Sequence, residues 1–73
     1  MNEPIYAAVG ARIRMIREAI GLDQASLARK VKMTRTSITN VEAGRQRLQL
    51  HQLLRYCEAL GTSPKHLLRG IWW

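Results

Sequence analysis

The chain has 73 residues, with 12 Lys and Arg against 5 Asp and Glu, and its formal net charge is +7 at pH 7. This length allows one small domain, and the charge favours a polyanionic partner (DNA, RNA or an anionic membrane surface), with solubility alone as the alternative role. A single cysteine excludes an intrachain disulfide. The sequence contains no run of about 18 apolar residues, so no transmembrane helix is predicted. Neither a basic region nor a long apolar stretch follows Met1, so we expect no signal peptide and a cytoplasmic location.

The first predicted helix runs from about Ile5 or Ala8 to Ile20, after residues 1–4, which we expect to be frayed. Gly10 should weaken its start by about 1 kcal/mol relative to alanine, and Gly21 should end it. Its apolar residues recur at helical spacing and predict one buried stripe, made of Val9, Ile13, Ile16 and Ile20.

Residues 23–42 predict two short helices joined by a tight turn. Asp23 and Thr34 are suitable N-cap residues, and Lys32 and Met33 break the apolar pattern between the helices. One buried stripe is expected on each helix, formed by Leu27, Ala28 and Val31 and then by Ile38 and Val41. The face opposite the second stripe is polar and comprises Arg35, Thr36, Thr39 and Asn40. An exposed face of hydrogen-bonding side chains in a basic chain suits the major groove of double-stranded DNA.

Two further helices are expected in the last third of the chain. Gly44 should cap the preceding helix and open a basic loop, residues 43–47. A helix from about Leu50 to Leu60 should bury one apolar face, made of Leu50, Leu53, Leu54, Cys57 and Leu60. Ser63 and Pro64 then start a short helix that turns Leu67 and Leu68 to the core and stops at Gly70. No alternating strand pattern occurs, so the sequence predicts one all-α domain, residues 1–73, with five short helices.

Residues suited to catalysis or metal binding are few. The candidates are His51, His66 and Cys57, and no CxxC or HxxxH spacing occurs. Cys57 lies on an apolar stripe and should be buried, and both histidines should face solvent. The glycines look like helix punctuation and not like a phosphate-binding loop. We therefore expect neither an enzyme nor a metal, cofactor or small-molecule site.

Arg17 and Glu42 are charged residues on or beside the two apolar stripes. A buried charge without a partner costs several kcal/mol, so a structural ion pair between them is favoured over two solvated side chains. Such a pair would fix the angle between the first helix and the third.

The ordered pattern resembles the phage Cro and repressor DNA-binding domains, the XRE-like helix-turn-helix family, over roughly residues 9–69. The matching residues are Gly21-Leu22, Gln24, Leu27-Ala28, Ile38, Glu42, Gly44-Arg45, Ala59-Leu60-Gly61 and Leu67-Leu68. The resemblance implies a compact five-helix bundle that regulates transcription by binding specific DNA, with an Arg–Glu pair such as Arg17 and Glu42. The chain departs from the family at Lys32, where glycine in a left-handed conformation is usual, and at Leu48, where proline is usual.

The resemblance also implies a division of the DNA contacts. Base contacts fall to Arg35, Thr36 and Asn40, with Thr39 as a weaker candidate for a base or a phosphate. For Arg35, the alternative to a base contact is a contact with a phosphate only. Phosphate contacts fall to Gln24 and Ser37 on the two helices and to Arg45 and Arg47 in the loop.

The expected assembly is a homodimer on a two-fold operator, acting as a repressor. Its interface should include Leu68, Ile71, Trp72 and Trp73, although the tryptophans have the alternative of folding back over their own chain. Other functions for the same fold are a DNA-binding antitoxin and a protein-interaction module, with a membrane-surface binder far less favoured.

Overall fold

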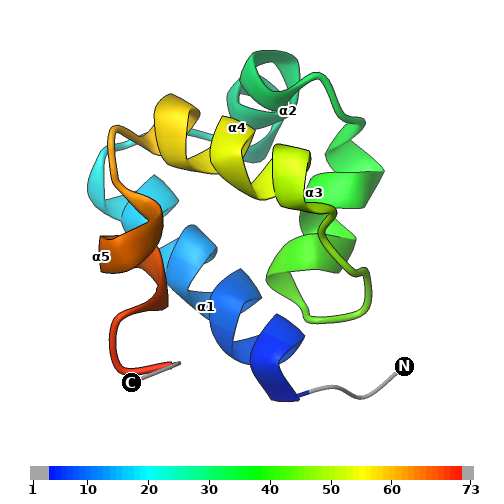
Figure 1. The fold of residues 1–73 in the computed structure, drawn as a ribbon. Coiled ribbons are helices and arrows are strands. Elements are labelled where there is room, and N and C mark those ends of the chain that lie inside the picture. The colour runs from blue at the N-terminus through cyan, green and yellow to red at the C-terminus, as the bar shows by residue number, and fades with distance from the viewer. Residues whose placement is uncertain (1–3, 72–73) are drawn as a thin grey trace.

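The computed structural model describes residues 4–71, and within that range it contains helices and no strand. The all-α class and the order of five short helices expected from the sequence are confirmed (Figure 1). The helices are α1 (Pro4–Ala19), α2 (Gln24–Val31), α3 (Arg35–Glu42), α4 (Leu50–Leu60) and α5 (Pro64–Leu68). None of these helices is both long and apolar enough to cross a membrane, within the residues described.

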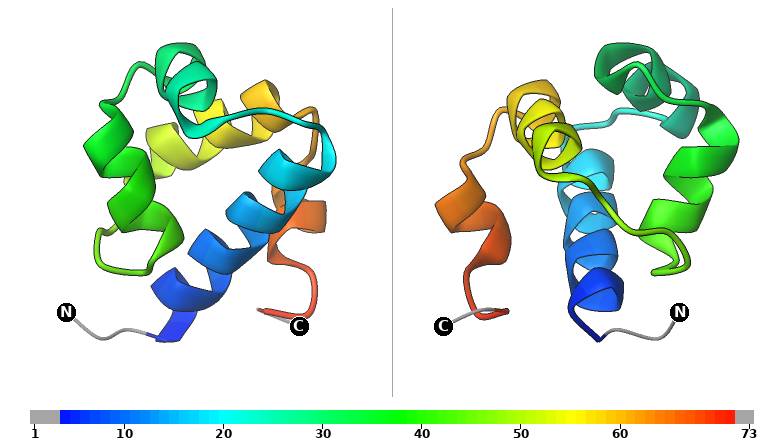
Figure 2. Two further views of the ribbon diagram at one scale, coloured as in Figure 1. Left: turned by 180° about the vertical axis from the view of Figure 1, so that it is seen from behind. Right: turned by 45° about the vertical axis from the view of Figure 1, so that its right-hand side comes forward.

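α1 runs through the middle of the molecule, and α3 and α5 lie on its two opposite sides (Figure 1 and Figure 2). α1 contacts both of them, whereas α2 packs against α3 and α4. The short helices α3 and α5 therefore present their outer faces on opposite flanks of the domain.

Every helix contributes one large side chain that is completely buried. These residues are Ile13, Leu27, Ile38, Tyr56 and Leu67, all with 0% of their surface exposed. Smaller apolar residues, including Val9, Ala28 and Val41, complete this single core. Because all five helices share one core, none of them can shift without disturbing the packing of the others.

The ends of α1 differ from the expectation in two respects. The helix already begins at Pro4, which suits a first helical position because it has no N–H to leave unpaired. Ile20 follows the helix in the C-terminal turn and is 54% exposed, so its assignment to the buried stripe is wrong. Gly21 takes φ +73° there, and the Leu22 N–H donates to the Arg17 carbonyl at 3.0 Å, which ends the helix.

The prediction of which residues form the buried face of α4 is also partly wrong. Leu50 and Leu54 are 75% and 53% exposed, although both carry large apolar side chains. The core instead receives the ring of Tyr56, which rotates the buried face of the helix away from these two leucines. The side chains on that face are Leu53, Tyr56, Cys57 and Leu60, of which only Leu53 is half-buried.

Gly10 has a tertiary role that the sequence did not indicate. It lies in the middle of α1, is buried, and faces the C-terminal turn of α3. A Cβ at this position would overlap the carbonyl oxygen of Val41 and approach the carbonyl oxygen of Glu42 to 3.0 Å. Gly10 therefore permits the close approach of α1 and α3, and its interpretation as helix punctuation is wrong.

The side chain of Arg12 fastens α5 to α1. Its guanidinium donates to the carbonyl oxygens of His66, Leu67 and Arg69 at 3.2, 3.3 and 2.9 Å. These carbonyls lie at the C-terminal end of α5, where intrahelical donors run out and a cation is favourable. This polar contact holds the last described turn of the chain beside α1.

Candidate nucleic-acid interface

The two helices of residues 23–42 start where the sequence predicts, each at a capping side chain. The Asp23 carboxylate accepts the Ser26 N–H at 2.7 Å, and the Thr34 hydroxyl oxygen accepts the Ser37 N–H at 3.0 Å. The hydrogen bonds from Ser26 lower the pKa of the Asp23 carboxyl. These caps fix the first turns of α2 and α3 and thus the orientation of their first N–H groups.

The turn between α2 and α3 requires a left-handed residue, and Lys32 supplies it. Lys32 has φ +58° and ψ +45°, and its N–H and that of Met33 both donate to the Ala28 carbonyl. A residue with a Cβ costs about 1 kcal/mol in this conformation relative to glycine. The chain therefore forms the same tight turn without the usual glycine.

The polar face of α3 is exposed, as the spacing predicts. Arg35, Thr36 and Thr39 are exposed and Asn40 is half-buried, while Ile38 is fully buried beneath them. α3 lies at the edge of the molecule with one side free of other elements (Figure 2). The structure thus brings all four expected base-contacting residues onto one accessible helix.

Arg17 and Glu42 lie within hydrogen-bonding distance and form the ion pair expected between α1 and α3. Arg17 Nε donates to Glu42 Oε2 at 2.7 Å, and Arg17 Nη2 donates to Oε1 at 3.1 Å. Both residues are 8% exposed, and Arg17 Nη1 also donates to the Leu22 carbonyl at 2.8 Å. The hydrogen bond to Glu42 is the main cause that raises the pKa of Arg17. These hydrogen bonds therefore offset much of the free-energy cost of burying the two charges.

Gln24 joins this ion pair to the exposed face of α3. Its Nε2 donates to Glu42 Oε1 at 3.1 Å, and its Oε1 accepts the Thr39 hydroxyl at 3.2 Å. From the sequence, Gln24 was expected only at a phosphate, and both of these hydrogen bonds were missed. They depend on the packing of the first turn of α2 against α3, for which no sequence spacing provides a signal.

Three of the expected phosphate-contacting residues lie in the first turn of α3 or in the loop after it. Ser37 lies in its first turn, where its hydroxyl oxygen accepts a hydrogen bond from Thr34 at 3.0 Å. Arg45 follows its last turn and donates from Nε to Asn40 Oδ1 at 3.4 Å, a long and weak hydrogen bond. Arg47 is exposed two residues further along the loop.

Tyr56 and Cys57 give α4 two buried groups that could titrate, and burial raises the pKa of each. The Tyr56 hydroxyl has no hydrogen-bond partner in the described structure. Neither side chain is accessible, so both belong to the core and not to a reactive site. Residues 4–71 bring together no group of three His, Cys, Asp or Glu that could hold a metal.

A basic domain that presents polar side chains on an exposed helix, held by a tight turn against a second short helix, is of the helix-turn-helix class. The sequence model of the helix-turn-helix domain family matches residues 8–69. The chain therefore belongs to this family. No protein of curated function matches the sequence significantly.

Solved structures of bacterial regulators share the fold. C.AhdI, the restriction-modification controller protein from Aeromonas hydrophila, is 31% identical with a TM-score of 0.84, and the match covers 89% of this chain and 98% of C.AhdI. The clp gene regulator ClgR from C. glutamicum is 28% identical with a TM-score of 0.86, over 88% of this chain and 82% of its own. The controller C.Esp1396I, solved as a tetramer on its natural 35-base-pair operator, is 25% identical with a TM-score of 0.84, over 94% and 91% of the two chains. These similarities confirm the family and fold class expected from the sequence.

Proposed function

We propose that this helix-turn-helix transcriptional regulator binds a two-fold DNA operator as a homodimer and represses transcription by occluding the promoter. The observation that carries the proposal is the polar face of α3, on which Arg35 and Thr36 are exposed and Asn40 is half-buried. Arginine can grip the O6 and N7 atoms of guanine, asparagine can grip adenine, and threonine can touch a thymine methyl. This face favours DNA over a protein partner because its side chains are polar and the chain is strongly basic.

The phosphate contacts are proposed for residues that surround this helix. Ser37 lies at the start of α3, and Arg45 and Arg47 follow its end, so they can meet the backbone on the two sides of the groove. Gln24 is the first residue of α2, where free backbone N–H groups also favour an anion. One N–H of its side-chain amide remains for a phosphate oxygen after the bond to Glu42.

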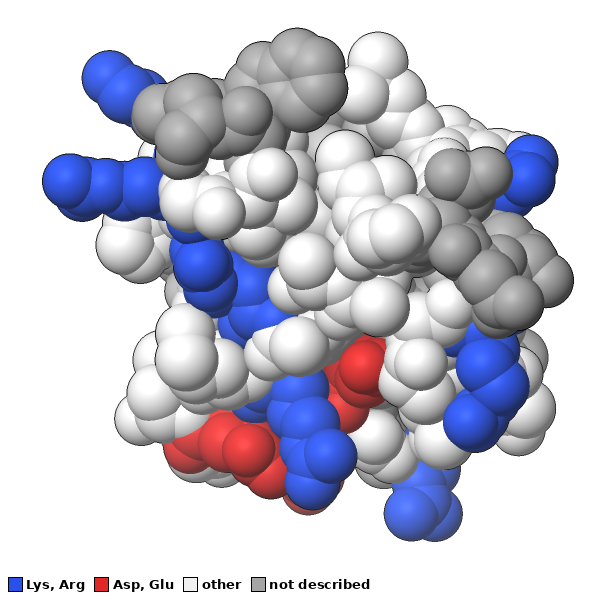
Figure 3. Space-filling model, turned by 90° about the horizontal axis from the view of Figure 1, so that it is seen from below, with Lys and Arg blue, Asp and Glu red and all other residues white. Residues whose placement is uncertain are grey.

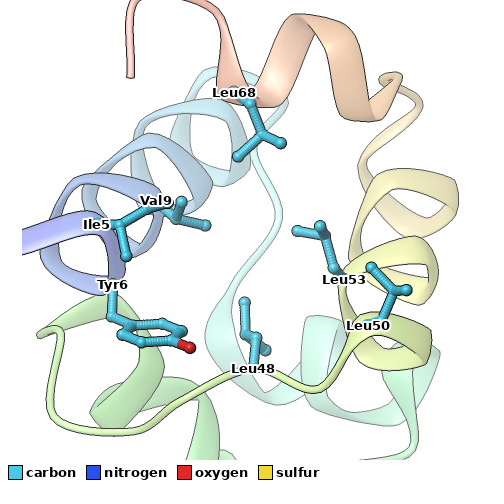
Figure 4. Close-up of a pocket in the computed structure, with 7 residues that line it drawn as sticks. All are labelled: Ile5, Tyr6, Val9, Leu48, Leu50, Leu53 and Leu68. Carbon is cyan, nitrogen blue, oxygen red and sulfur yellow. The ribbon is translucent and has the colours of Figure 1, made fainter. Parts of the chain in front are cut away.

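The homodimer is proposed to form through the face where α1, α4 and α5 meet. There an apolar hollow of about 260 Å³ opens between α1, the loop before α4, α4 itself and α5. Its side chains point into a common space, as Figure 4 shows, and they are Ile5, Tyr6, Val9, Leu48, Leu50, Leu53 and Leu68. Of the expected interface residues, Leu68 lines this hollow and Ile71 is half-buried, whereas Trp72 and Trp73 lie outside the described residues.

The surface charge is compatible with such an interface. Uncharged side chains cover much of the upper part of the surface in Figure 3, Lys and Arg project at its margins, and both positive and negative side chains cross its lower part. An apolar contact at the centre would let two chains of charge +7 approach without placing cations against each other. The resemblance to C.Esp1396I, a tetramer on its operator, also supports assembly on DNA.

Repression is favoured by the surface of α2. Activators of the resembling family often touch polymerase through an acidic patch near this helix, whereas this chain exposes Arg29 and Lys30 there. The proposed role is binding and not catalysis, in the cytoplasm, without a small-molecule ligand.

Selection of bound sequences from random duplex DNA, at a stated salt concentration, tests this function. We expect enrichment of two related half-sites in inverted orientation, about one helical turn (~34 Å) apart. The absence of any enriched sequence, with affinity that depends only on salt, would contradict sequence-specific regulation.

A further inference from the structure

The direction of the hydrogen bonds around Thr39 can be deduced from the chemistry of its partners. The Glu42 carboxylate accepts from Arg17, so it can only accept from Gln24 as well. The amide of Gln24 must then turn its N–H toward Glu42 and its oxygen toward Thr39. The two acceptors within reach of the Thr39 hydroxyl are this oxygen at 3.2 Å and the Arg35 carbonyl at 3.1 Å.

Neither of these oxygens can donate, so the single proton of the Thr39 hydroxyl is used inside the protein. Turning the hydroxyl outward to donate to DNA would exchange one hydrogen bond for another and gain little. Accepting a hydrogen bond from DNA, in contrast, adds a bond to the one already formed. The exposed hydroxyl of Thr39 therefore offers DNA its lone pairs and not its proton.

We propose that Thr39 determines base specificity as a hydrogen-bond acceptor, because Gln24 and the Arg35 carbonyl together retain its proton. In the major groove only the amino groups of adenine and cytosine can donate, whereas guanine presents two acceptors and thymine an acceptor and a methyl group. Thr39 thus selects adenine or cytosine on the strand that it faces. It does not hold a phosphate, since phosphate oxygens only accept.

The inference rests on the DNA-binding function proposed above, and one series of experiments separates the two. Sequences are selected from random duplex DNA with the parent chain, with Thr39→Val, which replaces the hydroxyl by a methyl group, and with Thr39→Ser, which keeps it. The operator position that responds to Thr39→Val is then rebuilt with the same base lacking its exocyclic amino group. Affinities of all three proteins for both duplexes are measured at one salt concentration.

We expect adenine or cytosine at the Thr39-dependent position, and a loss of about fivefold in affinity when the amino group is removed, equivalent to one hydrogen bond. The loss should appear with the parent chain and Thr39→Ser and vanish with Thr39→Val. Guanine or thymine at that position, an amino-group effect that persists in Thr39→Val, or equal weakening of all sequences by Thr39→Val would overturn this inference alone. If the parent chain enriches no sequence, the proposed function fails as well.

Discussion

The guanidinium of Arg17 on α1 meets the carboxylate of Glu42 on α3 through two hydrogen bonds of 2.7 and 3.1 Å, shielded from bulk water. The backbone of Glu42 also lies against Gly10, two turns earlier on α1. One residue at the end of α3 is therefore fixed to α1 twice, by its main chain and by its side chain. This arrangement fixes the orientation of α3 relative to the rest of the domain.

The first prediction concerns this ion pair. Glu42→Ala leaves Arg17 buried without a counter-charge and should lower the free energy of unfolding by roughly 3–5 kcal/mol. Loss of DNA binding would then follow from unfolding and not from a missing interaction with DNA. Urea denaturation of the two proteins measures the difference, and a Glu42→Ala protein that unfolds like its parent would show that the pair is solvated.

Glu18 offers a comparison on α1, the helix that carries Arg17. Its side chain is 55% exposed and lies 3.4 Å from Arg14 and 4.0 Å from the Arg17 guanidinium. Exposed pairs contribute about 0–1 kcal/mol, so Glu18→Ala should change the unfolding free energy little. Comparing the changes in unfolding free energy for Glu42→Ala and Glu18→Ala separates the effect of leaving a buried charge unpaired from the effect of removing any acidic residue.

The second prediction reverses the usual order of helix propensities at Gly10. In an exposed helix alanine is about 1 kcal/mol better than glycine. Gly10→Ala should nevertheless destabilise the domain by about 1–3 kcal/mol, because the added Cβ pushes against the Val41 carbonyl of α3. Thermal melting compares it with Ala11→Gly, an exposed position of α1 where the ordinary cost of glycine should appear. A Gly10→Ala protein that melts higher than the parent would mean that α1 and α3 do not approach so closely.

The third prediction uses the buried hydroxyl of Tyr56. It has no hydrogen-bond partner in the described structure, so Tyr56→Phe should leave stability near neutral pH unchanged or raise it by up to about 1 kcal/mol. A marked loss of stability would reveal a partner, such as a bound water.

The same variant should respond differently to alkaline pH. Burial raises the pKa of Tyr56 above its ordinary value of 10.0, so the folded protein keeps the neutral form. The contribution of this group to the free energy of unfolding is complete below pH 10. Above pH 10 the tyrosine ionises in the unfolded chain but not in the folded one, so the free energy of unfolding falls by about 1.4 kcal/mol per pH unit. Denaturation between pH 9 and about pH 11 should therefore show a steeper loss in the parent than in Tyr56→Phe, and parallel curves would count against burial of the hydroxyl.

The starts of α2, α3 and α5 and the end of α4 could be predicted because they depend on local chemistry. Asp23, Thr34 and Ser63 each accept a backbone N–H three residues later, as cap residues do, and Gly61 ends α4 with positive φ. The ion pair was also predictable, since two opposite charges on apolar stripes need each other.

Features that depend on how helices cross were not predictable from one sequence. Spacing placed Leu50 and Leu54 in the core, but the size of Tyr56 decided which face of α4 turns inward. Gly10 and Gln24 have their roles only because α3 lies against α1 and α2, so these roles appear only in the folded chain.

The fourth prediction concerns the proposed homodimer. A chain truncated after Gly70 lacks Ile71, Trp72 and Trp73 and should associate more weakly in sedimentation experiments, because three apolar residues of the proposed interface are gone. Leu50→Glu should weaken association too, since it puts a charge at the rim of the hollow while its 75% exposure leaves folding intact. Ile20→Glu, at an apolar residue of 54% exposure outside the hollow, is the control and should change nothing. An unchanged dimer in both the truncated chain and Leu50→Glu would place the interface elsewhere.

The central claim is that α3 reads bases and the residues around it hold phosphates, and binding of cognate and random DNA over a range of salt tests it most directly. Arg35→Ala and Asn40→Ala should each cost about 1–3 kcal/mol on the cognate operator, relax the preference at one base position and leave random DNA nearly unaffected. Arg45→Ala and Arg47→Ala should weaken both DNAs alike and reduce the slope of log K against log salt by about 0.9 for each phosphate that the protein no longer neutralises. Equal losses on cognate and random DNA for Arg35→Ala and Asn40→Ala would contradict the assignment of base recognition to this helix.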